Sequence, residues 1–148
     1  MVGRVNPKHP GNTKSSVLTR RLGKANRGAK RLLFVEGHPF FREGLALLLK
    51  WRKGFESVQA ESLAEACRVL NDSRGKVDLA IVDLDLSDGL SLIERIREIE
   101  PDIPVLALTS RYVLERNARA LRLGADEVLS TATEPEELIG AVERLATR

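Results

Sequence analysis

The chain contains 148 residues, of which 43% are hydrophobic and 30% are charged, and this suits one globular domain with a short extension. No apolar run approaches the roughly 18 residues of a membrane-spanning helix, and no signal-peptide core is present, so we expect a cytoplasmic protein without a membrane span. The single cysteine, Cys67, excludes an internal disulfide. It shares a helical face with Leu63, Ala66 and Leu70, which predicts a buried structural thiol.

The net charge of +3 is unevenly distributed. Residues 1–31 contain nine Lys or Arg and no acid, which leaves 15 of the 24 bases against all 21 acids in the remainder. Residues 1–30 are polar without a sustained hydrophobic period, so we predict a disordered basic tail before a folded, acidic domain over 31–148. The tail's charge is typical of nonspecific binding to nucleic acid or an anionic surface; the alternatives are an inert extension or a start site assigned too far upstream. The bases nearest the domain are Arg20, Arg21, Lys24, Arg27, Lys30 and Arg31.

Short apolar runs alternate with amphipathic segments from residue 31 onward. The predicted strands are Arg31–Glu36, Glu56–Ala60, Val77–Leu84, Ile103–Thr109 and Glu127–Ser130. The predicted helices are Phe40–Trp51, a segment capped by Ser62 that ends near Asn71, Leu90–Ile99, Val113–Leu123 and a final helix that begins at Glu134-Pro135. This order predicts an α/β fold in which helices cover both faces of a parallel sheet. Ligands of such sheets bind at the carboxyl ends of the strands, which directs attention to Glu36, Gly37, Asp83, Thr109 and Thr131.

Four collinear stretches carry a resemblance to a known family. Phe34–Leu45 (FVEGHPFFREGL) is similar to the opening of response-regulator receiver domains, especially the LuxR-type regulators. Asp78–Leu86 resembles the third strand of these domains, Pro104–Ser110 the fourth strand, and 124–126 the turn into the fifth. The resemblance covers residues 31–147 and implies a flavodoxin-like, three-layer, doubly wound sheet of five parallel strands in the order 2-1-3-4-5.

The resemblance also implies phosphoryl transfer to a carboxylate. Asp83 matches the phosphoacceptor and Thr109 the switch hydroxyl. Mg²⁺ would be held by carboxylates, here Glu36 and Asp83 with Asp85 as a weak third, and would neutralise the phosphoryl oxygens. A family lysine supplies a further positive charge, and Thr131 aligns with it.

Several departures from the family pattern predict a weakened site. Gly37 replaces the carboxylate that touches the metal directly, Thr131 replaces the lysine and Val128 the aromatic residue coupled to the switch threonine. The loop after Asp83 lacks the usual proline and is about two residues shorter. We therefore expect weak Mg²⁺ binding and weakened or absent phosphorylation.

Two neighbouring residues would partly replace the missing acid and the missing cation. Asp85 shares the side-chain direction of Asp83 by strand alternation and would restore acidic charge, while Arg111 would restore the cation. The simpler alternative is a solvated Asp85–Arg111 pair at the rim. His38 precedes Pro39 in a loop-to-helix turn, which favours a structural role, and neither histidine has a partner at zinc-ligand spacing.

The sequence predicts a stand-alone signalling protein of a two-component phosphorelay and not an enzyme. Its expected partners are a histidine kinase or another signalling protein, docked on the face of the fourth and fifth strand–helix units. The chain ends about where the receiver resemblance ends, so no DNA-binding output domain is expected. The alternative is a phosphorylation-independent interaction module whose basic tail binds nucleic acid or an anionic surface.

Overall fold

The computed structural model describes residues 28–148 apart from residue 74. Within this part, five parallel strands form one sheet in the order β2-β1-β3-β4-β5. Their bounds are β1 Arg31–Val35, β2 Glu56–Ala60, β3 Leu79–Asp83, β4 Val105–Thr109 and β5 Glu127–Ser130. The predicted strand order and flavodoxin-like class are confirmed.

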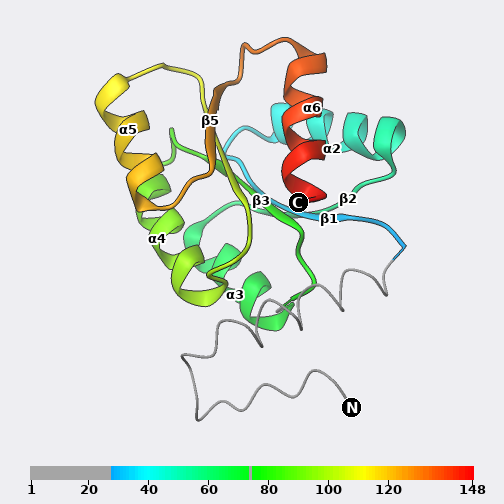
Figure 1. Cartoon of the computed structure of the whole chain (residues 1–148), viewed down its shortest axis with the longest axis horizontal. Helices are drawn as coiled ribbons and strands as arrows, with labels where there is room; N and C mark the ends of the chain where they lie inside the picture. The colour runs from blue at the N-terminus through cyan, green and yellow to red at the C-terminus, as the bar shows by residue number, and fades with distance from the viewer. Residues whose placement is uncertain (1–27, 74) are drawn as a thin grey trace.

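Helices cover both faces of the sheet (Figure 1). Their bounds are α2 Pro39–Lys53, α3 Leu63–Asp72, α4 Gly89–Ile99, α5 Leu114–Leu123 and α6 Pro135–Ala146. Alternate side chains of β1 separate the two cores: Leu32 and Phe34 pack with α2 and α6, whereas Leu33 and Val35 pack with α3 and α4. The central strands β3 and β4 are buried along their whole length, as their continuous apolar runs predict.

Local signals explain where most elements begin. The Ser62 hydroxyl accepts a hydrogen bond from the Glu65 backbone N–H at 3.2 Å, as a helix N-cap should. The strand predicted from Ile103 begins instead at Val105, because Pro104 has no N–H to contribute to the ladder. The strand predicted from Val77 begins at Leu79, and the Asp78 carboxylate accepts the Arg31 N–H at 2.8 Å beside it.

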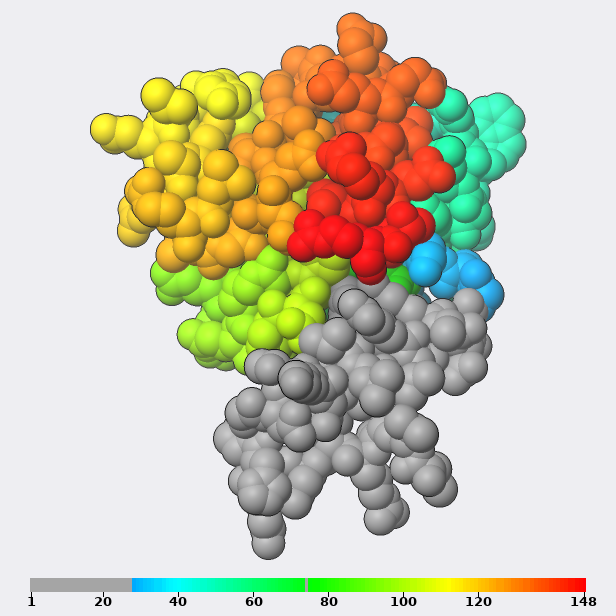
Figure 2. All heavy atoms as spheres, in the orientation of Figure 1, coloured from blue at the N-terminus to red at the C-terminus, as the bar shows by residue number. Residues whose placement is uncertain are grey.

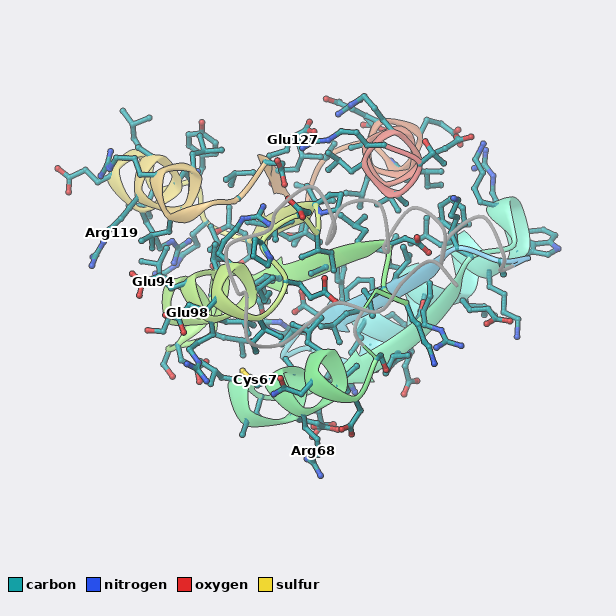
Figure 3. All side chains as sticks on the ribbon, turned by 60° about the horizontal axis from the view of Figure 1, so that its bottom comes forward. Cys67, Arg68, Glu94, Glu98, Arg119 and Glu127 are labelled. Carbon is teal, nitrogen blue, oxygen red and sulfur yellow. The ribbon has the colours of Figure 1, made fainter. Side chains whose placement is uncertain are left out.

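The one cysteine is buried, as predicted. Figure 3 shows Cys67 on the side of α3 near α4, whereas Arg68 points outward. No helix among the described residues is long and apolar enough to cross a membrane. Of the six tail bases singled out above, Arg31 is the first residue of β1 and Lys30 directly precedes it, while the other four lie outside the described residues.

Candidate functional site

Asp83 ends the central strand β3, and its side chain is 3% exposed. Two backbone groups orient its carboxylate: the Gly37 N–H donates to Oδ2 at 3.2 Å, and the Asp85 N–H donates to Oδ1 at 2.8 Å. The carboxyl ends of β1 and β3 therefore hold one acid in a fixed orientation at the strand-order switch of the sheet.

Glu36 follows β1 and lies beside Asp83 with 2% of its surface exposed. Its Oε1 accepts the His38 backbone N–H at 3.1 Å and lies 2.9 Å from His38 Nδ1. His38 Nδ1 is also 4.0 Å from Asp83 Oδ2, although its side chain is 70% exposed. Three ligand atoms, from Glu36, His38 and Asp83, thus lie within 4.8 Å of one another.

The protonation of this cluster reflects burial. Desolvation raises the pKa of Glu36, and the hydrogen bond and charge of Asp83 raise it further, against the opposing hydrogen bonds of His38. The hydrogen bond and charge of Glu36 raise the pKa of His38. Two neighbouring buried acids repel each other, and a bound cation or a proton on Glu36 would relieve this repulsion.

A side chain at Gly37 would require Leu86 to move. A Cβ at Gly37 would lie 2.9 Å from Leu86 Cδ2 and 3.5 Å from Asp83 Oδ2. Leu86 belongs to the short loop after Asp83, and that loop closes tightly, because a Cβ at Gly89 would lie 2.7 Å from the Asp83 carbonyl oxygen. Leu86 of this loop therefore lies against the space that a side chain at residue 37 would enter.

A second cluster lies at the end of β4, built around Thr109 and Asp85. Thr109 is fully buried, and its hydroxyl lies 2.9 Å from Asp85 Oδ1 and 2.7 Å from the Arg111 carbonyl oxygen. Asp85 Oδ2 accepts the Ser110 N–H at 2.7 Å and the Ser110 hydroxyl at 2.5 Å. From α5, Arg116 Nη2 donates to Asp85 Oδ1 at 3.0 Å and to Thr109 Oγ1 at 2.5 Å.

This second cluster corrects the predicted partner of Asp85. The cation that pairs with Asp85 is Arg116, and the side chain of Arg111 is exposed while its backbone bonds to Thr109. Asp85 also turns toward β4, so it is not among the residues that converge with Asp83 on a shared ligand position. The physical reason is that β3 ends at Asp83, so strand alternation no longer governs the direction of Asp85.

Two further predicted positions lie in β5 and directly after it. Thr131 follows β5, and its N–H donates to the Thr109 carbonyl at 2.9 Å. Val128 lies within β5 and packs against the core on the α4 side of the sheet. A neutral hydroxyl side chain thus directly follows β5.

The donor set can be compared with the needs of the metal that the family implies. Mg²⁺ is held in proteins through one or two carboxylates and several waters, so Glu36 and Asp83 fit such an ion. The third group, His38, is an imidazole, a donor that suits borderline transition metals better than Mg²⁺. Glu36 and Asp83 would hold the ion, which supplies positive charge near the carboxylate of Asp83.

Two residues of these clusters were not found by sequence reasoning. Arg42 is 6% exposed, and its Nη1 donates to the Glu36 carbonyl at 2.9 Å, which braces the loop after β1. The available signal was its place on the apolar face of α2, three residues before Leu45. Arg116 had no such signal, because it meets Asp85 across 31 residues of chain.

A five-stranded parallel sheet with two neighbouring acids, Glu36 and Asp83, at its strand-order switch is the architecture of a receiver domain. Residues 32–143 match the response regulator receiver domain family. The chain therefore belongs to this family. It is 31% identical over 120 residues to the methanol utilization control regulatory protein MoxX of Paracoccus denitrificans, and 36% identical over 120 residues to the virulence transcriptional regulatory protein PhoP of Salmonella typhimurium. These alignments cover 78% and 80% of this chain but only 53% and 52% of the two relatives, so the chain spans about half of their length.

Solved receiver structures are similar in fold. One is a response regulator from Burkholderia pseudomallei with a phosphorylated aspartic acid, a calcium ion and citrate, with a TM-score of 0.69 and 28% identity over 80% of this chain and 69% of that chain. Another is a LuxR-family two-component response regulator from Aurantimonas, with a TM-score of 0.73 and 26% identity over 81% of this chain and 86% of that chain.

Proposed function

We propose that this chain is a receiver of a two-component phosphorelay in which Asp83 is the phosphoacceptor and Mg²⁺-dependent phosphorylation is weakened or lost. The observation that carries the proposal is the surroundings of Asp83. Its oxygens are met by two backbone N–H groups and lie beside Glu36, while a threonine follows β5 where the family has a lysine. The acceptor is therefore oriented, but the groups that would neutralise an incoming phosphoryl group are depleted.

The reaction proposed for Asp83 is a simple exchange of one bond. A carboxylate oxygen of Asp83 attacks the phosphorus of a phosphohistidine on a partner kinase. A P–O bond forms as the P–N bond breaks, and the departing imidazole nitrogen keeps the electron pair and takes up a proton from solvent. Because charge on the phosphoryl oxygens is stabilised mostly by cations and positioned donors, each missing group slows this step.

Partner docking is proposed for the face that carries α5. Tyr112 is 70% exposed, Leu114 is 72% exposed, and Leu121 also lies at the surface. Figure 2 shows α5 (yellow) as a projecting corner of the described part, next to β5 and α6 (orange to red). Exposed apolar groups beside the switch threonine suit a surface that another signalling protein covers.

The test is stabilisation by beryllofluoride, which mimics an aspartyl-phosphate. Thermal unfolding of the full chain is followed with Mg²⁺ and increasing beryllofluoride, in parallel with Asp83→Asn. We expect a saturable but weak rise in the unfolding midpoint that Asp83→Asn abolishes. An equal rise in both proteins would contradict the assignment of Asp83.

The charge asymmetry supports a second proposed function, binding of nucleic acid or an anionic surface by the basic tail. Residues 1–31 contain nine bases and no acid, whereas the rest of the chain contains more acids than bases. Such binding falls steeply as salt rises. An electrophoretic shift at low salt should be lost when Arg20, Arg21, Lys24 and Arg27 are all changed to Ser; an unchanged shift would rule out this role.

A further inference from the structure

We propose that Asp85 is a resident anion that competes with a phosphoryl group on Asp83 for Thr109 and Ser110, and that it sets the position of α5 through Arg116. The inference rests on the proposed function, because it assigns Thr109 to the phosphoryl group. It adds a regulatory role for two residues, Asp85 and Arg116, whose side chains the proposed phosphoryl transfer does not use.

The contacts of Asp85 resemble those of a bound anion. Its two oxygens accept four hydrogen bonds: from the Thr109 hydroxyl, from the N–H and the hydroxyl of Ser110, and from Arg116. A hydroxyl, a backbone N–H and a guanidinium are the donors that proteins direct at phosphate oxygens. The side chain of Asp85 is 17% exposed; its contacts with Thr109 and Arg116 are partly buried, and those with Ser110 are exposed.

The hydroxyl group of Thr109 already has hydrogen-bond partners for both its proton and its oxygen. Its single hydroxyl proton is directed to Asp85 Oδ1 or to the Arg111 carbonyl. Its oxygen accepts the Arg111 N–H at 3.1 Å and Arg116 Nη2 at 2.5 Å. A phosphoryl group on Asp83 can gain this hydroxyl proton only by taking it from its present acceptor, which is Asp85 Oδ1 or the Arg111 carbonyl.

Asp83 and Asp85 are linked through the chain itself. The Asp85 backbone N–H orients Asp83, while the Asp85 side chain occupies the donors of β4. A phosphoryl group on Asp83 would therefore place added negative charge next to a carboxylate that already holds the same donors. The two anions repel each other and compete, so Asp85 opposes the response to phosphorylation.

Arg116 connects Asp85 to α5, so a change at Asp85 would affect this helix. Nη2 alone makes all of its contacts, with Asp85, Thr109 and the Arg111 carbonyl, while Nε is buried without a partner among the described residues. Arg116 lies in the first turn of α5, two residues after the exposed Leu114. Loss of the Asp85 anion would release the start of the helix that carries the proposed docking face.

The experiment compares wild type with Asp85→Asn in the full chain, by ¹H–¹⁵N NMR with Mg²⁺ and beryllofluoride. Asp85→Asn keeps the size of the side chain and removes its charge; Asp88→Asn, in the same loop, is the matched control. In Asp85→Asn, the amides of Ser110 and of residues 114–121 should respond to beryllofluoride, and the midpoint concentration should fall about tenfold, the scale of one charge-assisted hydrogen bond. In wild type and in Asp88→Asn, only amide signals close to Gly37 and Asp85 should change with beryllofluoride.

The outcomes separate this inference from the proposed function. A response at Gly37 in Asp85→Asn without one at Ser110, or equal responses of α5 in all three proteins, would overturn the role of Asp85 and leave Asp83 as acceptor. Absence of any response at Gly37 would contradict the assignment of Asp83 as the acceptor.

Amide hydrogen exchange without beryllofluoride then decides the inference. The amides of Ser110 and of the first turn of α5 should exchange at least about tenfold faster in Asp85→Asn than in Asp88→Asn, and equal rates would refute it.

Discussion

The backbone N–H of Asp85 donates to the Asp83 carboxylate at 2.8 Å, while the side chain of Asp85 turns away to Thr109 at 2.9 Å. One residue thus orients the proposed acceptor and occupies the hydroxyl that an acceptor phosphate would need. This relationship links the two clusters of the site through a single residue.

A buried acid pair should make stability depend on pH. The pKa of Glu36 is raised in the folded state, so the folded protein binds a proton more tightly than the unfolded chain does, and the free energy of unfolding falls as pH rises through that pKa. The charged groups facing Glu36 are Asp83 and His38, and Arg42 meets its carbonyl. We expect Glu36→Gln to be more stable than wild type at pH 7 and to lose that advantage near pH 4, in urea unfolding with EDTA. A difference in the free energy of unfolding between the two proteins that does not change with pH would contradict this prediction.

Restoring the missing acid should require more than one substitution. Because Leu86 Cδ2 lies 2.9 Å from the position of a Cβ at residue 37, Gly37→Asp alone should be poorly accommodated. Gly37→Asp combined with Leu86→Ala should bind Mg²⁺ about tenfold more tightly than wild type, or 1.4 kcal/mol, by calorimetry. Leu86→Ala alone is the control; it should lose about 2 kcal/mol of stability without gaining Mg²⁺ affinity. Tight binding by Gly37→Asp alone would show that Leu86 is not the obstacle.

The imidazole of His38 should change which ions bind. His38 Nδ1 lies 2.9 Å from Glu36 Oε1, so one ion could bind both groups in place of their hydrogen bond, and imidazole and carboxylate are donors that Zn²⁺ accepts. Untagged protein should bind Mn²⁺ or Zn²⁺ more tightly than Mg²⁺ in calorimetry. His38→Gln should weaken Zn²⁺ binding at least about tenfold, the scale of losing even an outer-shell partner, and leave Mg²⁺ binding little changed. His9→Gln is the matched control. If it weakens Zn²⁺ binding more than His38→Gln does, the ion does not bind at Glu36, His38 and Asp83.

The sequence predicted most of the fold because its signals were local. Continuous apolar runs identified β3 and β4, and Ser62 marked a helix start that the structure confirms. The places of Asp83 and Thr109 followed from the same reasoning, since the carboxyl ends of parallel strands meet at one edge. Their proposed roles in phosphoryl transfer remain predictions.

The partners of Asp85 could not be predicted in the same way. Arg111 was the cation nearest to Thr109 in sequence, yet the ion pair forms with Arg116, which one turn of α5 brings back over the end of β4. The packing of Leu86 into the space beside Gly37 likewise depends on the path of a loop. Both contacts arise from tertiary placement, which spacing along the chain does not encode.

The measurement that tests the central claim most directly is incorporation of a phosphoryl group from acetyl phosphate and Mg²⁺, followed by intact-mass spectrometry over time. Wild type, Asp83→Asn and Thr131→Lys are compared, with Thr133→Lys as the control for added charge in the same loop. We expect slow, incomplete incorporation in wild type, none in Asp83→Asn, and a rate on the order of tenfold higher in Thr131→Lys only. Rapid and complete incorporation in wild type, unchanged by Thr131→Lys, would contradict the account of a receiver whose acceptor is kept and whose supporting charges are depleted.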